Sequence, residues 1–81
     1  GRQVVLHLTR AEERFALLIR NMPAVREVKI VENKLLVTLE NPETQNPEII
    51  RTLVNAGAEI QFVGELRHSL EDVYLQLVKN A

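Results

Sequence analysis

The chain has no cysteine, no tryptophan and only three glycines, which lie far apart. Without cysteine it can form neither a disulfide nor a thiolate metal site. A phosphate-binding loop needs several neighbouring glycines, so that backbone amides can approach the anion. Because Gly1, Gly57 and Gly64 are isolated, we expect no nucleotide site and no bound cofactor within this chain.

Long apolar runs and an excess of one charge are also missing. No apolar run approaches the roughly 20 residues that a membrane-spanning helix requires. The formal net charge of −1 argues against a nucleic-acid footprint or a polybasic membrane patch. RNA-binding sheets stack bases on exposed aromatic residues, whereas Phe15 and Phe62 are expected in the core. We therefore do not expect nucleic acid among the partners.

Candidate catalysts and metal ligands are sparse. His7 and His68 fall in different predicted elements, so we expect no metal site. Ser69, His68 and Asp72 lie too close together at a helix start to aim at one another as a catalytic triad, and Ser69 suits a helix cap better. Arg10 follows the first strand without the glycines of an acylphosphatase-like phosphate loop. The sequence predicts no enzyme activity for this segment.

Period-two alternation of apolar residues predicts four strands, over residues 4–8, 25–31, 35–40 and 60–66. The polar residues 32–34 form a turn between the second and third strands, in which Asn33 is expected to be left-handed. Residues expected to point inward from the strands are Val4, Leu6, Leu8, Val28, Ile30, Leu35, Val37, Leu39, Ile60, Phe62 and Leu66.

Two amphipathic helices separate these strands. The first is predicted to open with a capping box at residues 9–12 and to stop before Pro23. The second is predicted to begin at Asn46, followed by Pro47, after a loop over residues 41–46, and Gly57 is placed to end it in a left-handed conformation. Their apolar stripes are expected to be Ala11, Phe15, Leu18, Ile19 and Met22, then Ile49, Ile50, Leu53, Val54 and Ala56.

A third helix is predicted after the last strand. Ser69 to Asp72 has the form of a capping box. Glu71 and Asp72 lie in the first turn, where the helix dipole favours negative charge. The residues that follow place one apolar stripe at helical spacing, while Leu75 lies off it. The stripe consists of Leu70, Val73, Tyr74, Leu77 and Val78.

The predicted element order is β-α-β-β-α-β with an extra C-terminal helix. This order indicates an α+β fold, a ferredoxin-like sandwich in which two helices cover one face of an antiparallel sheet. With 81 residues and 46% hydrophobic content, the chain is expected to form one small domain over residues 1–81. It begins Gly-Arg-Gln without Met, so we expect a domain excised from a longer protein.

The sheet face away from the two helices is expected to be half apolar. It would carry Val5, Val31, Leu36 and Val63 among polar residues, which is more apolar surface than a solvated face needs. Two covers are possible, the C-terminal helix of the same chain or a partner chain. The other residues expected on this face are His7, Lys29, Thr38 and Gln61.

The segment from Gly64 to Leu75, with its Ser-Leu-Glu-Asp-Val-Tyr-Leu string, resembles the C-terminal end of bacterial ABC-transporter ATP-binding subunits of the drug- and antibiotic-exporter type. In that family a small accessory domain follows the nucleotide-binding domain and closes with a Leu-Glu-Asp/Asp-Glu-Val/Ile-Phe/Tyr-Leu motif. The element order of the whole chain agrees with this resemblance. Tyr74 stands where Phe is frequent in the family.

The resemblance implies a non-catalytic accessory or regulatory domain at the C-terminus of an ATPase subunit, whose ATP and Mg sites lie elsewhere in the parent protein. The expected partners are the ATPase domain of the same chain, a second copy of the subunit in a homodimer, and a membrane permease. The expected location is cytoplasmic, peripheral at the inner face of the membrane. The residues implied in assembly or coupling are Leu70, Glu71, Asp72, Val73, Tyr74 and Leu75.

An alternative of a different class is an ACT-like regulatory domain that senses small molecules. Such domains pair edge to edge and bind amino acids, commonly with a glycine-bearing loop after the first strand. The corresponding residues here, 9–12, contain no glycine, which counts against this alternative.

Overall fold

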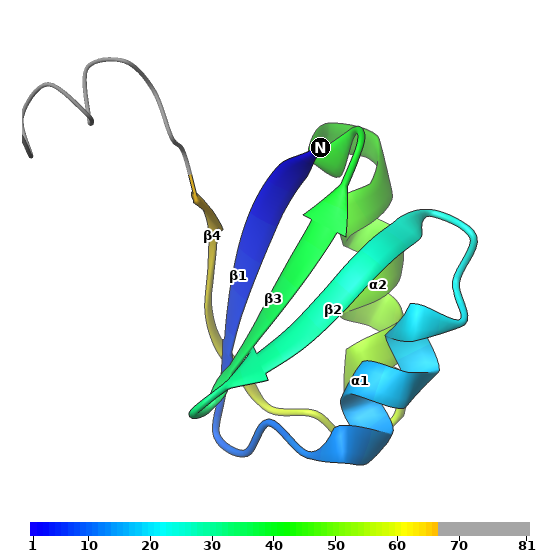
Figure 1. Cartoon of the computed structure of the whole chain (residues 1–81). Coiled ribbons are helices and arrows are strands. Elements are labelled where there is room, and N and C mark those ends of the chain that lie inside the picture. The colour runs from blue at the N-terminus through cyan, green and yellow to red at the C-terminus, as the bar shows by residue number, and fades with distance from the viewer. Residues whose placement is uncertain (67–81) are drawn as a thin grey trace, which may run out of the picture.

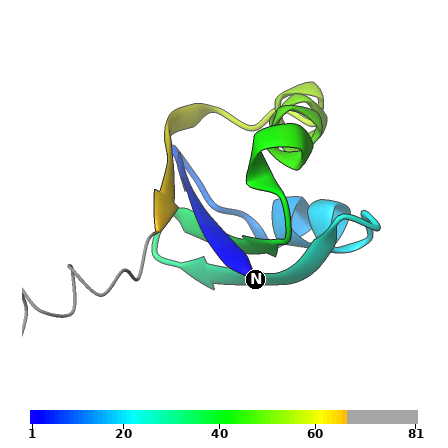
Figure 2. The same ribbon diagram turned by 90° about the horizontal axis from the view of Figure 1, so that it is seen from above.

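The computed structural model describes residues 1–66 of the chain. Along these residues the elements are β1 (Arg2–Leu8), α1 (Glu13–Arg20), β2 (Val25–Val31), β3 (Lys34–Leu39), α2 (Pro42–Asn55) and β4 (Ile60–Leu66). The strands form one antiparallel sheet in the order β2-β3-β1-β4 (Figure 1). Both helices lie on the same side of it (Figure 2). The predicted α+β, ferredoxin-like βαββαβ arrangement is confirmed, and the predicted C-terminal helix lies outside the described residues.

The core lies between the sheet and the two helices. The central strands β1 and β3 bury every second residue, and the buried side chains of α1 and α2 pack against them. Burying each of these large apolar side chains contributes about 1.5–3 kcal/mol. The predicted inward residues of β1 and β3 are confirmed. The most deeply buried side chains are Val4, Leu6, Leu8, Ile19, Leu35, Val37, Leu39, Ile49 and Leu53.

The first helix starts later than its sequence suggests. Its N-cap is Glu12, and no side chain caps it, so the predicted capping box at residues 9–12 is wrong. The backbone amide of Thr9 instead donates to the carbonyl oxygen of Glu59 at 3.0 Å, which ties the end of β1 to the residue before β4. The buried face is also rotated, because Ala16 is buried while Leu18, predicted to be buried, is 40% exposed.

The second helix starts earlier than predicted, because residues 42–46 are helical rather than part of a loop. Asn41 precedes Pro42, and this pair supplies the same start signal that Asn46 and Pro47 supply. The carbonyl oxygen of Asn41 accepts bonds from the amides of Thr44 and Gln45, and the Gln45 side chain accepts one from the Asn41 amide. Pro47 therefore lies inside the helix.

Two turns depend on left-handed backbone. Gly57 has φ 95° after α2, as predicted for a residue that ends the helix. In the hairpin between β2 and β3, the left-handed residue is Glu32, with φ 57°, rather than the predicted Asn33.

A β-bulge in β4 changes which residues face the helices. Leu8 pairs with Ile60 and His7 pairs with Phe62, so Gln61 is an extra residue in β4. A bulge of one residue reverses the alternation beyond it. Phe62 therefore turns away from the helices and is 70% exposed, so its predicted core position is wrong. Val63 pairs with Leu6 on the helix side, so its predicted place on the opposite face is also wrong.

Adjacent residues of α2 provide a matched test of the core. Leu53 is fully buried and Val54, predicted to be in the buried stripe, is 53% exposed. We expect Leu53→Ala to lower the free energy of unfolding by about 2–5 kcal/mol, because it leaves a cavity. Val54→Ala should change it by about 0.5 kcal/mol or less. Urea denaturation followed by circular dichroism measures both, and equal losses would contradict this core.

Candidate functional site

The sheet face that points away from α1 and α2 is covered by neither of these helices (Figure 2). We call it the open face. The strand registers place its side chains in three rows that cross all four strands. The rows, from β2 to β4, are Val31, Lys34, His7 and Phe62; Lys29, Leu36, Val5 and Gly64; and Glu27, Thr38, Gln3 and Leu66.

The centre of the open face is apolar. Val5 and Leu36 pair directly across β1 and β3 and are half-buried by their neighbours. Val31 at 44%, Phe62 at 70% and Leu66 at 40% exposure surround them. A shallow hollow of about 450 Å³ lies on this face and is lined by Val5, His7, Val31, Lys34, Leu36, Gly64, Glu65 and Leu66. This is a larger exposed apolar cluster than a solvated sheet face requires.

Gly64 leaves a notch at the edge of this hollow. A β-carbon built on Gly64 would have no other atom within 4 Å, so the space beside it is open. Its neighbours on the same face of β4 are Phe62 and Leu66, two residues away on either side, because side chains on one face alternate. The notch is therefore bordered by Phe62 and Leu66 along β4 and by Val5, which pairs with Gly64 on β1.

The rim of the open face carries an aromatic contact and basic side chains. The rings of His7 and Phe62 meet edge to face, with centroids 5.8 Å apart and planes at 88°. Toward β2, the Lys29 ammonium lies 3.5 Å from the Glu27 carboxylate. An apolar floor with a polar rim has the anatomy of a protein interaction surface.

On the helix side of the sheet, Arg2 joins three elements. Its guanidinium donates to both carboxylate oxygens of Glu65, at 2.6 and 2.8 Å, and lies 2.5 Å from the Glu43 carboxylate at the start of α2. The hydrogen bond from Arg2 lowers the pKa of Glu43, and the two carboxylates raise the pKa of Arg2. These ion pairs of Arg2 hold the end of β4 against β1, immediately before the last described residue, Leu66.

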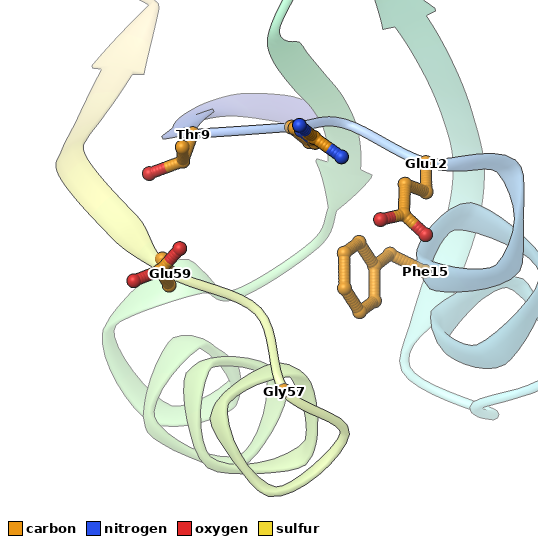
Figure 3. A pocket seen from close by; sticks show the side chains of 6 residues that line it. Thr9, Glu12, Phe15, Gly57 and Glu59 are labelled. Carbon is orange, nitrogen blue, oxygen red and sulfur yellow. The ribbon is translucent and has the colours of Figure 1, made fainter.

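A second hollow of about 310 Å³ lies where the β1–α1 and α2–β4 loops meet (Figure 3). The Glu12 carboxylate at its edge forms an ion pair with Arg14 at 2.9 Å. The Arg14 guanidinium lies 4.1 Å over the centre of the Phe15 ring. It also donates a hydrogen bond to the carbonyl oxygen of Ala56 at 2.8 Å. Its lining residues are Thr9, Arg10, Glu12, Phe15, Gly57 and Glu59.

Within residues 1–66 no group of three or more His, Asp or Glu side chains is placed to hold a metal ion. Over the same residues, no buried residue is polar or charged.

The open face holds three of the four apolar residues predicted for it, Val5, Val31 and Leu36, and Val63 lies on the other side. Sequence analysis missed Phe62, Gly64 and Leu66, because strict alternation places them inward. One signal was present, since a glycine within a strand often marks a nearby bulge. The residues predicted from the family motif, Leu70 to Leu75, lie outside the described residues.

Comparison with known protein families decides the relationship. The model of the family described as the C-terminal domain of DrrA1-3-like ATP-binding proteins matches residues 1–78. The chain belongs to this family. The resemblance to the C-terminal domain of an ABC-transporter ATP-binding subunit is thereby confirmed. A search of curated proteins finds no match. Neither helix among residues 1–66 is long and apolar enough to cross a membrane.

Proposed function

We propose that this domain is a non-catalytic accessory part of its ATP-binding subunit, and that it promotes assembly of the subunit with a second copy or with the permease. The observation that carries the proposal is the apolar open face, where Val5, Leu36 and Phe62 lie uncovered by either described helix. In this proposal ATP and Mg are bound elsewhere in the parent protein, and the domain works on the cytoplasmic side of the membrane.

The composition of the open face supports binding to protein. Aromatic residues are enriched in interface cores, and Phe62 is a large side chain that is 70% exposed on a β-strand. Its ring is already oriented by the contact with His7, so little rotamer freedom is lost when a partner covers it. In the sequence, the family motif at Leu70 to Leu75 follows this strand after three residues, 67–69.

The complete ATP-binding subunit offers the direct test. We expect Phe62→Lys and Tyr74→Ala each to weaken subunit assembly at least about tenfold, because losing a buried aromatic anchor costs upwards of 1–2 kcal/mol. Light scattering measures dimer formation, and co-purification measures permease binding. Leu17→Lys is the matched control, since Leu17 is 54% exposed on α1, away from the open face. Unchanged assembly in both variants, with the domain still folded, would refute the proposal.

The second hollow favours one other function, an ACT-like amino-acid sensor. It lies directly after β1, and Gly57 from the neighbouring loop lines it in place of a glycine within residues 9–12. Arg10, also in the lining, could receive a carboxylate.

A thermal-shift screen separates the two functions. A ligand at a hundred times its Kd would raise the melting temperature of a domain of this size by about 10 °C or more. We expect no amino acid at millimolar concentration to produce a rise. A rise that Arg10→Ala abolishes, and that Arg51→Ala on α2 leaves intact, would favour the sensor instead.

A further inference from the structure

We propose that residues 69–78 of this same chain dock on the open face and close its hollow. The position at which the described chain ends is the first reason. β4 is an edge strand, and Leu66 at its end has its side chain on the open face, in the row of Gln3 and Thr38. Leu66, the last described residue, also lines the hollow, so the chain continues from a residue at the rim of the hollow.

The length of the following segment suits the width of the sheet. A helix over residues 69–78 would be about 15 Å long, at 1.5 Å per residue. Four strands at about 4.8 Å spacing span about 14 Å between the outer strands. The residues between Leu66 and Ser69 number two, Arg67 and His68, which is within the usual length of a connection between a strand and a helix. One helix can therefore cross from β4 to β2.

The side chains of the segment complement the face. The sequence predicts an apolar stripe of five residues, and the open face offers an apolar floor at Val5 and Leu36. The space beside Gly64, between Phe62 and Leu66 on the same face, is open. Tyr74 fits this place, because its ring is apolar and its hydroxyl can remain at the polar rim.

The same chain is a better occupant than the open face of a second copy. Two open faces packed together would leave the predicted stripe of residues 69–78 without this apolar floor to cover it. A tethered segment also acts at a millimolar effective concentration without a partner. Docking would turn Asp72 and Leu75 outward, opposite the stripe at helical spacing.

The role of this outward-facing side of the segment rests on the proposed function and deepens it. The docked segment and the sheet would then form the assembly surface together, and Phe62→Lys would weaken assembly through loss of docking. The docking itself does not depend on a partner, so it can be tested on the isolated chain of residues 1–81.

Tyr74 is a built-in probe, because the chain has one tyrosine and no tryptophan. We expect acrylamide to quench the fluorescence of Tyr74 at least about threefold less efficiently than that of free N-acetyl-tyrosinamide, since a tethered segment stays mostly docked. Protection should be the same across protein concentrations, with a monomer in light scattering. Gly64→Val and Phe62→Lys should each raise quenching close to the free value. Leu17→Lys should leave it unchanged.

The variants are chosen to keep the fold. The space beside Gly64 is open and valine favours strands, while Phe62 is 70% exposed, so neither change disturbs the core. Circular dichroism checks this. Docking in the same chain is refuted if Tyr74 of the unmodified chain is as accessible as the free compound, if Gly64→Val leaves its protection intact, or if protection rises with concentration as a dimer forms. These results would not refute the proposed function, because the assembly test with Phe62→Lys in the complete subunit decides it separately.

Discussion

The extra residue in β4, Gln61, is the constraint on which both faces of the sheet depend. Before it, Ile60 packs toward the helices opposite Leu8, and after it Phe62, Gly64 and Leu66 point the other way. Without the bulge, Phe62 and Leu66 would join the core and Val63 would lie on the open face. The bulge therefore moves one aromatic and one aliphatic side chain from the interior to the surface, at the cost of leaving Gln61 unpaired in the ladder.

The rest of the structure holds this arrangement in place. At the start of β4, the backbone bond from Thr9 to Glu59 fixes the strand to the end of β1. At its far end, the Arg2 guanidinium binds the Glu65 carboxylate and reaches Glu43 of α2. The strand between these two attachments presents Phe62 and Gly64 on a rigid support, which is what an interaction surface requires to limit the entropy lost on binding. The family relationship places this surface on the C-terminal domain of an ATP-binding protein.

The central strands of the fold could be predicted from the sequence, because their alternation of apolar and polar residues matches the burial of one face. In β1 and β3 the alternation is strict, and one face of each strand is buried while the other is only half-buried. Their inward residues were therefore predictable. Helix starts were less predictable, because residues 41–47 contain two Asn-Pro pairs with the same local signal, and only packing of Pro42 in the core selects the first. At residues 9–12 a capping pattern was present, but pairing of Thr9 with Glu59 removed it from the helix.

The candidate site was predictable only in part for a similar reason. No bulge separates Val5, Val31 or Leu36 from the neighbouring core residues of the same strand. Their face therefore followed from the alternation. The face of β4 depends on a single inserted residue, and no local preference of Gln61 indicates that it is unpaired. Long-range register, set by pairing with β1, decides it.

The most direct test of this account is the contact between His7 and Phe62, because it exists only if the bulge lies at Gln61. A nuclear Overhauser spectrum of the isolated chain should show cross-peaks between the ring protons of His7 and those of Phe62, whose centroids are 5.8 Å apart. The ring of Phe62 should show none to the methyl groups of Leu6 or Ile49. Cross-peaks from Phe62 to those core methyl groups, with none to His7, would place Phe62 in the interior and contradict the open face described here.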